Sequence, residues 1–297
     1  GQNNLWVMNA DGSNPRPIFT ENYVRAASPA WSADGQYIIV ERSQLPNGGQ
    51  PGSGGLWMYH KDGGTGVELL ARSRQPASWP SPSRDGRFLY YQVTGQGSSL
   101  AGYGGRGDFI SGTVQVRRMD MRSGEISSVS FGEQTQQVQG SSGGMGAPEV
   151  SPDGKWLAFV RRIPDGTITW KGHTYGPRSA LWLRELDTGY ERLLVDPVEQ
   201  DIFEGGKVLR SFPGYVWSAD GRSIVFTQGG KLRRVDVASG TVATIPFSAP
   251  IKRTISELAN TQTKQSDAPF DVRFTRWQSA SPDGRRVAFQ AVGRVWV

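Results

Sequence analysis

One turn sequence recurs along the whole chain, and each copy is followed by a short run of apolar residues. The turn is Ser-x-Asp-Gly, which occurs five times. The runs that follow it, such as residues 37–40 and 88–91, are rich in Ile, Val, Leu and aromatic residues. Short apolar runs between turn signals are typical of β-strands. The five turns contain the pairs Asp34 and Gly35, Asp85 and Gly86, Asp153 and Gly154, Asp220 and Gly221, and Asp283 and Gly284.

The residue types of this repeat suit a hairpin turn. Pro or a small residue fits the second position of a type I turn, and Asp can accept a hydrogen bond from its own backbone. Gly accepts the left-handed conformation that comes next. We therefore interpret the five Asp residues as turn-forming residues and not as catalytic ones.

A second apolar segment lies between successive turns, as at residues 56–59 and 181–184. Most of these segments are followed by another Gly-containing turn and then by a further short strand, such as residues 67–70. Each period therefore predicts four strands. The Asp residues of successive turns are 51, 68, 67 and 63 positions apart. This pattern predicts an all-β fold, a β-propeller of four-stranded antiparallel blades.

We expect residues 1–297 to form one propeller domain that begins and ends inside a period. A partial blade is expected at 1–27, followed by blades at about 28–76, 77–146, 147–213 and 214–275, and a second partial blade at 276–297. The ends could close a five-bladed ring with one redundant strand, or the chain could be a segment of a larger propeller. Unpaired strand edges at both ends predict self-association.

Tryptophan follows the repeat at eight of its ten positions. We interpret these residues as packing between blades, and we also expect Trp156 to be buried. Only Trp170, in an insertion at 163–177, lies outside the pattern. The eight are Trp31, Trp79, Trp217 and Trp277, shortly before a turn, and Trp6, Trp57, Trp182 and Trp296, in a third strand.

Insertions between the predicted strands are the candidate functional surfaces, because loops on a rigid scaffold often carry binding residues. Three regions stand out: 45–55, 95–112 together with 141–145, and 163–177. Gly-rich loops are also tolerated without a function, so both interpretations stay open. The segment 251–258 could cover the propeller or contact a neighbouring domain, and a connector is the alternative. In the third insertion we single out Trp170, His173, Tyr175 and Arg178 as candidate surface residues.

Composition narrows the chemistry that this chain can perform. The 39 Gly and 18 Pro residues disfavour long helices, and no apolar stretch approaches the ~20 residues of a membrane helix. The net charge of +6 is scattered along the sequence, so no nucleic-acid partner is indicated. The absence of Cys excludes disulfides, thiolate nucleophiles and Cys-ligated metals.

No catalytic set is recognisable in the sequence. Metal-dependent hydrolases need clustered His ligands, whereas His60 and His173, the two His residues, lie 113 positions apart. A Gly-x-Ser-x-Gly nucleophile motif is missing, and the Gly-x-Gly-x-x-Gly match at 102–107 lacks the helix that a dinucleotide site needs. We therefore predict no catalytic, cofactor-binding or metal-binding residue in this chain.

The repeat resembles that of TolB-like propellers along nearly the whole chain. The resemblance is carried by Ser-Pro-Asp-Gly-Lys-Trp-Leu-Ala-Phe at 151–159 and by Trp-Ser-Ala-Asp-Gly-Arg-Ser-Ile-Val-Phe at 217–226. Tricorn-type and prolyl-oligopeptidase-type proteases share such repeats. The resemblance therefore implies a fold and leaves the function open.

Four more specific segments, at 56–60, 169–178, 229–236 and 288–297, are similar to the propeller region of large bacterial amidohydrolases. This resemblance implies further blades on both sides and a C-terminal hydrolase barrel that would hold zinc or a similar metal. It also implies a periplasmic or secreted protein. Because residues 1–6 lack a basic head and an apolar stretch, an exported chain would be a processed or trimmed form.

The leading hypothesis is a non-catalytic scaffold, substrate gate or interaction module whose partner is the hydrolase domain of the same parent protein. The alternative is a stand-alone TolB-like periplasmic propeller that binds a protein or peptide. A propeller enzyme that acts on a small molecule or sugar is a third hypothesis. It would need convergent carboxylates and bases that sequence alone does not place.

Overall fold

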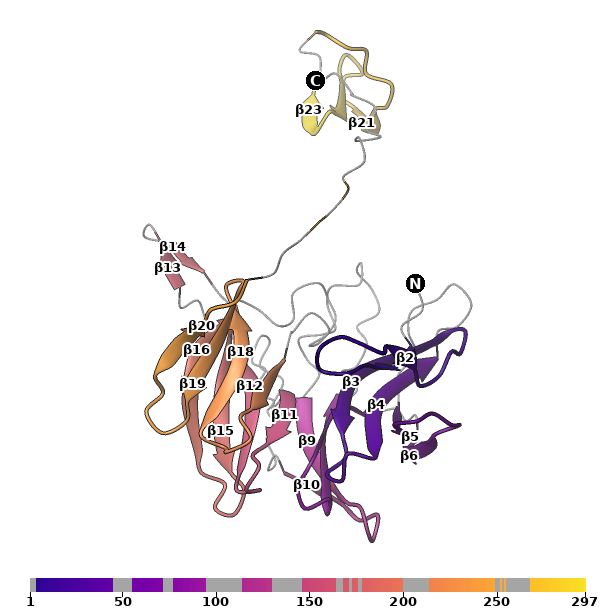
Figure 1. Ribbon diagram of the computed structural model, residues 1–297. Helices are drawn as coiled ribbons and strands as arrows, with labels where there is room; N and C mark the ends of the chain where they lie inside the picture. Colours follow the sequence, from indigo (N-terminus) through magenta and orange to yellow (C-terminus); the bar gives the residue numbers. More distant parts are fainter. Residues whose placement is uncertain are drawn as a thin grey trace. The chain divides into compact units, whose positions relative to one another are not determined.

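The computed structural model describes residues 4–44, 55–71, 77–94, 114–129, 146–163, 168–170, 173–175, 178–199, 214–248, 252, 254 and 268–297. The chain divides into two compact units, Gly1–Ser248 and Ala249–Val297. Every regular element in the described residues is a β-strand (Figure 1), and none of them forms a helix long and apolar enough to span a membrane.

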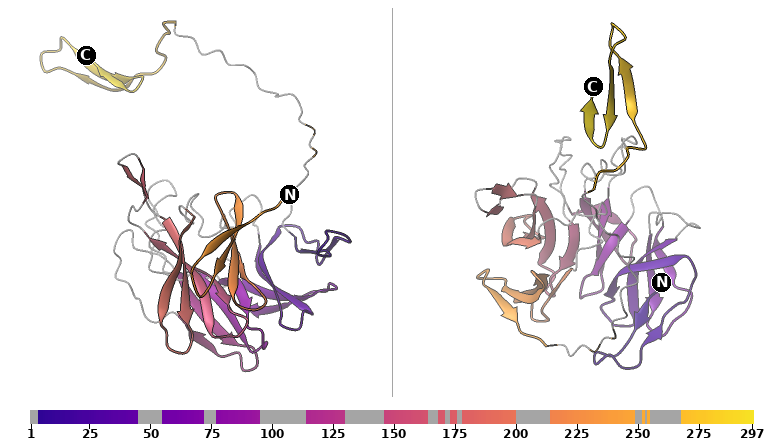
Figure 2. Two further views of the ribbon diagram at one scale, coloured as in Figure 1. Left: turned by 60° about the vertical axis from the view of Figure 1, so that its left-hand side comes forward. Right: turned by 90° about the horizontal axis from the view of Figure 1, so that it is seen from above.

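Four antiparallel sheets of four strands make up most of the first unit, and we call them blades 1 to 4. Figure 2 shows them side by side in sequence order. Blade 1 contains β3 (Val24–Trp31), β4 (Tyr37–Gln44), β5 (Gly55–His60) and β6 (Val67–Leu70). Blade 2 contains β7 (Ala77–Pro82), β8 (Phe88–Thr94), β9 (Val114–Asp120) and β10 (Ile126–Ser128). Blade 3 contains β11 (Gly146–Val150), β12 (Trp156–Ile163), β15 (Arg178–Glu185) and β16 (Glu191–Glu199), and blade 4 contains β17 (Tyr215–Trp217), β18 (Ser223–Gln228), β19 (Lys231–Asp236) and β20 (Val242–Ile245).

Smaller sheets accompany the blades. In the first unit β1 (Trp6–Val7) pairs with β2 (Arg16–Pro17), and β13 (Ile168–Trp170) pairs with β14 (His173–Tyr175). The second unit holds one three-stranded antiparallel sheet of β21 (Arg276–Ala280), β22 (Val287–Ala291) and β23 (Arg294–Trp296). The predicted all-β class with four-stranded antiparallel blades is thus confirmed.

The apolar core lies between neighbouring blades. In β8, the side chains of Leu89 and Tyr91 pack with blade 1, whereas Tyr90 packs with blade 3. Successive residues of a strand point to opposite faces, so a strand between two neighbours needs apolar residues at every position. This explains the unbroken apolar run after the turn. Blades 3 and 4 share the largest cluster, which includes Leu181, Leu183, Val195, Tyr215, Trp217, Ile224 and Phe226.

A left-handed residue lies in the first strand of blades 1 to 3 and directly before that of blade 4, always four positions before the Ser of the turn motif. The backbone φ angle there is 49° at Ser28, 51° at Trp79, 49° at Ala147 and 83° at Gly214, and 56° at Trp277 of the second unit. In β3, β7, β11 and β21 the pairing register shifts at this point, as in a β-bulge. The bulge re-aims the residues that follow it.

The tryptophan prediction is partly wrong. Trp217 is buried, and Trp57, Trp79, Trp156 and Trp182 are half-buried against the clusters between sheets. Trp6, Trp31, Trp277 and Trp296 are instead at least 50% exposed. Trp6 lies on a two-residue strand, and Trp31 ends β3 at the start of its turn. Trp277 and Trp296 belong to a single three-stranded layer, which by itself cannot enclose a core.

Candidate functional site

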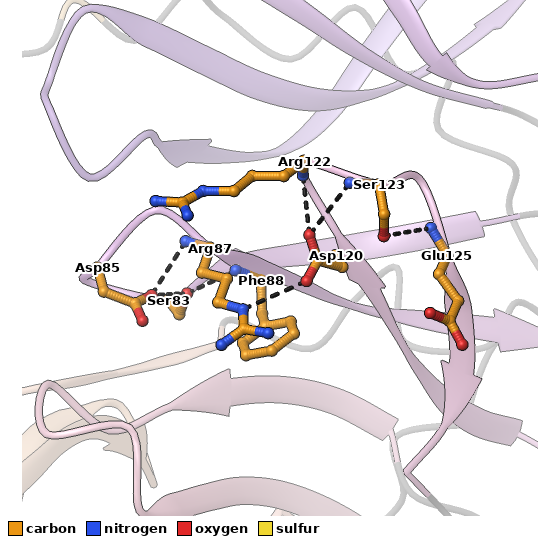
Figure 3. Close-up of polar contacts among 8 residues, drawn as sticks. All are labelled: Ser83, Asp85, Arg87, Phe88, Asp120, Arg122, Ser123 and Glu125. Atoms are coloured by element: carbon orange, nitrogen blue, oxygen red, sulfur yellow. Dashed lines mark hydrogen bonds and ion pairs between the residues drawn. The ribbon is translucent and has the colours of Figure 1, made fainter.

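The Ser-x-Asp-Gly turn is a closed set of hydrogen bonds, shown for blade 2 in Figure 3. The Ser83 hydroxyl donates to Asp85 Oδ1 over 2.5 Å, and the Arg87 amide donates to the same oxygen over 3.0 Å. The Phe88 amide donates to Ser83 Oγ over 2.9 Å as the next strand begins. The side chains of one Ser and one Asp therefore satisfy the Arg87 and Phe88 amides, while the Gly86 amide donates to the Ser83 carbonyl oxygen.

All five copies repeat this geometry. The motif Ser donates to the motif Asp, and the amide two residues after the Asp donates to the same carboxylate. The Gly of each turn has a φ angle between 66° and 72°, where glycine is favoured. The donated hydrogen bonds of Ser83 and of the Arg87 amide lower the pKa of Asp85. The pKa of each of the other four motif carboxyls is lowered as well.

A second turn in blade 2 is tied to the first by an arginine. Asp120 Oδ1 accepts hydrogen bonds from the amides of Arg122 and Ser123, at 2.9 and 3.2 Å (Figure 3). Its Oδ2 accepts from Arg87 Nε over 3.2 Å. These bonds, the two backbone ones first, lower the pKa of Asp120. The carboxylates of both turns are therefore engaged within the fold.

The motif turns of different blades also meet one another. A Cβ atom on Gly86 would stand 3.6 Å from the Ala33 side chain in the blade 1 turn, and one on Gly221 would stand 3.6 Å from Pro152 in the blade 3 turn. Arg84 Nη1 donates to the Ala219 carbonyl oxygen over 3.1 Å, from the blade 2 turn to the blade 4 turn. The turns thus form one continuous contact region.

A buried carboxyl joins blades 2 and 3 on their first strands. Glu149 Oε2 accepts a hydrogen bond from Ser81 Oγ over 2.9 Å, and Ser81 Oγ accepts one from the Val150 amide over 3.0 Å. Protein surrounds the carboxyl although part of the residue is exposed. Burial raises the pKa of Glu149 to about 7, and the hydrogen bond of Ser81 opposes this rise. Among the described carboxyls with a resolved shift, Glu149 is the one whose pKa is raised.

Blade 4 also contacts the strand of blade 3 that carries Glu149. Trp217 Nε1 donates to the Glu149 carbonyl oxygen over 3.0 Å, and the Tyr215 hydroxyl donates to the Ala147 carbonyl oxygen. The Ala147 amide donates to the buried Gln92 Oε1 of blade 2 over 2.9 Å. Burial, and then the Glu149 charge, raise the pKa of Tyr215 well above its ordinary value. We call Ser81, Gln92, Ala147, Glu149, Tyr215 and Trp217 the inner joint.

Trp79 reaches from blade 2 to blade 4. A Cβ atom on Gly214 would stand 3.5 Å from Trp79 Cζ3, and the Trp79 side chain packs against the cluster that blades 3 and 4 share. Both residues have a left-handed backbone four positions before the motif Ser, Trp79 within β7 and Gly214 directly before β17. The Trp79 indole of blade 2 thus contacts the core that blades 3 and 4 share.

Of the candidate surface residues in the insertion, Trp170 lies in β13, His173 and Tyr175 lie in β14, and Arg178 begins β15. Backbone pairing places Trp170 opposite His173, and Tyr175 opposite Ile168. Arg178 forms a two-pronged ion pair with Asp196, with Nε–Oδ1 at 2.5 Å and Nη2–Oδ2 at 2.8 Å. The expected loop surfaces at 45–54, 95–112 and 141–145, the motif at 102–107 and most of 251–258 lie outside the described residues.

His60 contributes to a turn in blade 1. Its Nδ1 accepts a hydrogen bond from the Asp62 amide over 3.2 Å, and its ring meets the Tyr37 ring edge-on at 5.4 Å. Within the described ranges, no three or more His, Cys, Asp or Glu side chains lie together so that they could hold a metal ion. The geometry of the inner joint supports a hydrogen-bonded contact between blades, in which Ser81 bonds both the Glu149 carboxyl and the Val150 amide.

The four-stranded antiparallel blades place this chain among β-propellers, and its fold is similar to that of TolB. It has a TM-score of 0.53 against TolB from Acinetobacter baumannii, with 17% identity over 98% of this chain and 57% of that one. The chain thus spans little more than half of the length of that TolB. An oligogalacturonate lyase from Vibrio parahaemolyticus gives a TM-score of 0.45, with 10% identity over 96% of this chain and 79% of that one. A β-propeller domain from Myceliophteria thermophila gives a TM-score of 0.41, with 13% identity over 90% and 62%.

The fold assignment rests on the Acinetobacter TolB, the one of these three whose TM-score exceeds 0.5. At 17% identity this likeness concerns the fold alone. No family model matches the chain, and no curated protein matches it.

Proposed function

We propose that this chain is a non-catalytic scaffold, substrate gate or interaction module of an exported, amidohydrolase-like protein whose catalytic barrel lies outside it. On this proposal the partner is the hydrolase domain of the same parent protein. Zinc or a similar metal belongs to that domain, and the propeller is periplasmic or secreted.

The observation that carries the proposal is that these carboxylates accept hydrogen bonds from groups of the fold itself. Each motif Asp accepts hydrogen bonds from its own turn, and Glu149 is bonded to Ser81 of the neighbouring blade. A carboxylate held in this way maintains blade structure and is poorly placed to bind a catalytic metal. The similarity of residues 229–236 and 288–297, which include β19 and β23, to amidohydrolase propellers supports the choice of partner.

The intact mass of the naturally expressed protein, with its end sequences, tests the proposal. The same sample is assayed for amide-bond hydrolysis before and after zinc is added, and the purified 297-residue chain is the control. A mass well above 32.5 kDa together with zinc-dependent hydrolysis is the expected result. A natural product of 32.5 kDa without zinc-dependent activity contradicts the proposal.

That contrary result would favour the second candidate, a stand-alone TolB-like periplasmic propeller that binds a protein or peptide. One observation favours this candidate. Among the described residues β23 pairs with β22 along one edge and with no strand along the other, and Trp296 of β23 is half-exposed. An open strand edge can accept an extended peptide or a second copy of the chain.

Self-association through such edges is tested by light scattering over a range of protein concentrations. We expect the mass to rise with concentration, together with slower hydrogen exchange in β23. A constant monomer mass with unchanged exchange contradicts self-association.

A further inference from the structure

On blade 1, a buried tyrosine and a mostly buried arginine carry hydrogen-bond donors that have no acceptor among the described residues. Arg42 of β4 places its guanidinium 4.3 Å from the centroid of the Trp57 ring, and its Nη2 donates to Glu21 Oε2. Its Nε is buried without an acceptor. Tyr59 of β5 stacks on Trp57, with ring centroids 6.2 Å apart. It is fully buried, and its hydroxyl has no hydrogen-bond partner.

The Tyr59 hydroxyl lies near the ion pair of Arg42 and Glu21. Burial raises the pKa of Tyr59 to about 12, and the charges of Arg42 and Glu21 act on it as well. The ring is held in place from the other side by the backbone, because a Cβ atom on Gly66 would stand 2.5 Å from Tyr59 Cε1. The unused donor is therefore fixed beside an arginine that already binds a carboxylate.

The equivalent positions of blade 3 show a carboxylate bound by two donors. Arg161 stands ten positions after its motif Ser, as Arg42 does. Arg184 takes the place of Tyr59, since each of the two residues pairs with the residue six positions after the motif Ser. Glu191 Oε2 accepts a hydrogen bond from Arg161 and its Oε1 accepts one from Arg184, at 2.8 Å each. Each carboxylate oxygen thus has its own donor.

Blade 1 repeats this arrangement only in part. Glu21 comes from the segment between β2 and β3, and among the described residues it bonds Arg42 alone. Its side chain is 46% exposed, whereas that of Glu191 is 23% exposed. The Tyr59 hydroxyl, at the position of the second donor, is left without an acceptor. A buried donor without an acceptor costs free energy, so a carboxylate that bonds both groups is held better than Glu21.

We propose that Arg42 and Tyr59 form a binding site for the carboxylate of a small organic acid, which takes the place of Glu21. One oxygen of the ligand accepts a hydrogen bond from Arg42 and the other accepts one from the Tyr59 hydroxyl, as the two oxygens of Glu191 accept theirs in blade 3. Glu21 is then a competitor supplied by the chain itself. The site is independent of the proposed function, so its failure leaves that proposal unaffected.

Acetate is the probe, added to the full chain at neutral pH and constant ionic strength, with acetamide as the uncharged control. The nitrogen-15 resonance of Arg42 Nε, identified by its loss in Arg42→Lys, reports binding. We expect acetate to shift this resonance to saturation and acetamide to leave it unchanged. Glu21→Gln removes the competing charge at the same side-chain length. If Glu21 occupies Arg42 about 90% of the time, acetate should bind this variant about tenfold more tightly. A Glu21→Gln protein whose Arg42 Nε does not respond to acetate overturns the proposal.

Tyr59→Phe separates the proposed site from a general attraction of anions to arginine. In the Glu21→Gln background, loss of the hydroxyl should weaken acetate binding at least about tenfold, because a hydrogen bond to a charged group is lost. Tyr23→Phe changes an exposed tyrosine beside the same segment and should bind acetate as its parent does. If Glu21→Gln does not fold, the wild type is the parent for both variants. Equal acetate binding by Tyr59→Phe and its parent means an adventitious ion only and overturns the proposal.

Discussion

The motif turns and the inner joint both contain carboxyls, but the two regions place them in opposite environments. In the turn of blade 2, Asp85 is exposed and accepts bonds from a hydroxyl and a backbone amide, which lower its pKa. In the inner joint, protein surrounds the Glu149 carboxyl, which accepts a hydrogen bond from one hydroxyl. Its pKa is raised. The number of donors and the access of water decide the direction of the shift. The turns therefore favour an ionised carboxyl, and the joint favours a neutral one.

The largest expected effect comes from removing the blade 4 side of the joint. Trp217→Ala deletes a buried indole and leaves the Glu149 carbonyl oxygen without its partner. We expect the free energy of unfolding to fall by about 3–5 kcal/mol, as for other buried aromatic-to-Ala changes. Urea denaturation measures this loss. A loss below about 1 kcal/mol would mean that blades 3 and 4 do not depend on this contact.

The pH dependence of stability separates the two kinds of carboxyl. The pKa of Glu149 lies above its unfolded value, so its neutral form favours folding and stability falls as pH rises from about 4.5 to about 7. We expect this one group to lower the free energy of unfolding by up to about 3 kcal/mol between pH 5 and pH 8. Denaturation at both pH values measures the change. Glu149→Gln should reduce it, and an identical pH profile in that variant would contradict the assignment.

A variant in the turn of blade 2 should lower the free energy of unfolding by a smaller amount, and it concerns a carboxyl whose pKa is lowered instead of raised. Ser83→Ala removes the donor to Asp85 and the acceptor of the Phe88 amide. We expect a loss of about 1–2 kcal/mol, because a partly buried amide loses its partner. The pKa of Asp85 should rise towards its ordinary value. Denaturation and carboxyl titration test the two parts, and an unchanged Asp85 pKa would show that Ser83 is not its main donor.

The smallest expected effect is at the contact between the blade 2 and blade 4 turns. Arg84→Met keeps most of the side-chain volume but removes the donor to the Ala219 carbonyl oxygen. Because the bond is solvent-exposed, we expect a loss below about 1 kcal/mol. The urea midpoint measures it. A loss of stability as large as that of Trp217→Ala would mean that the contacts between turns stabilise the blades as much as the inner joint does.

The blades could be predicted from sequence because their turns are local. Ser83, Asp85 and Phe88 complete their bonds within six residues, so the residue types alone specify the hairpin. The inner joint could not be predicted in the same way, because Ser81 and Glu149 are separated by 68 positions. A signal was nevertheless present. Both residues stand two positions before the motif Ser of adjacent repeats, so superposing the repeats would have brought them together.

The exposed tryptophans show where periodicity alone misleads. Trp31 and Trp217 directly precede the motif Ser, whereas Trp79 and Trp277 stand four positions before it, on the left-handed residue. Position in the repeat did not determine burial, because Trp217 is buried and Trp31 is 51% exposed. The difference comes from the neighbouring sheet: blades 3 and 4 share a core around Trp217. Burial thus depends on partners that a single repeat does not encode.

The contact between Trp79 and Gly214 limits how such a chain can diversify. The two residues occupy the same repeat position in blades 2 and 4, yet one is the largest side chain and the other has none. A duplicated blade 2 in place of blade 4 would bring a second indole into the space of the first. The blades are therefore alike in fold but not interchangeable in order, and gene duplication alone cannot replace one with another.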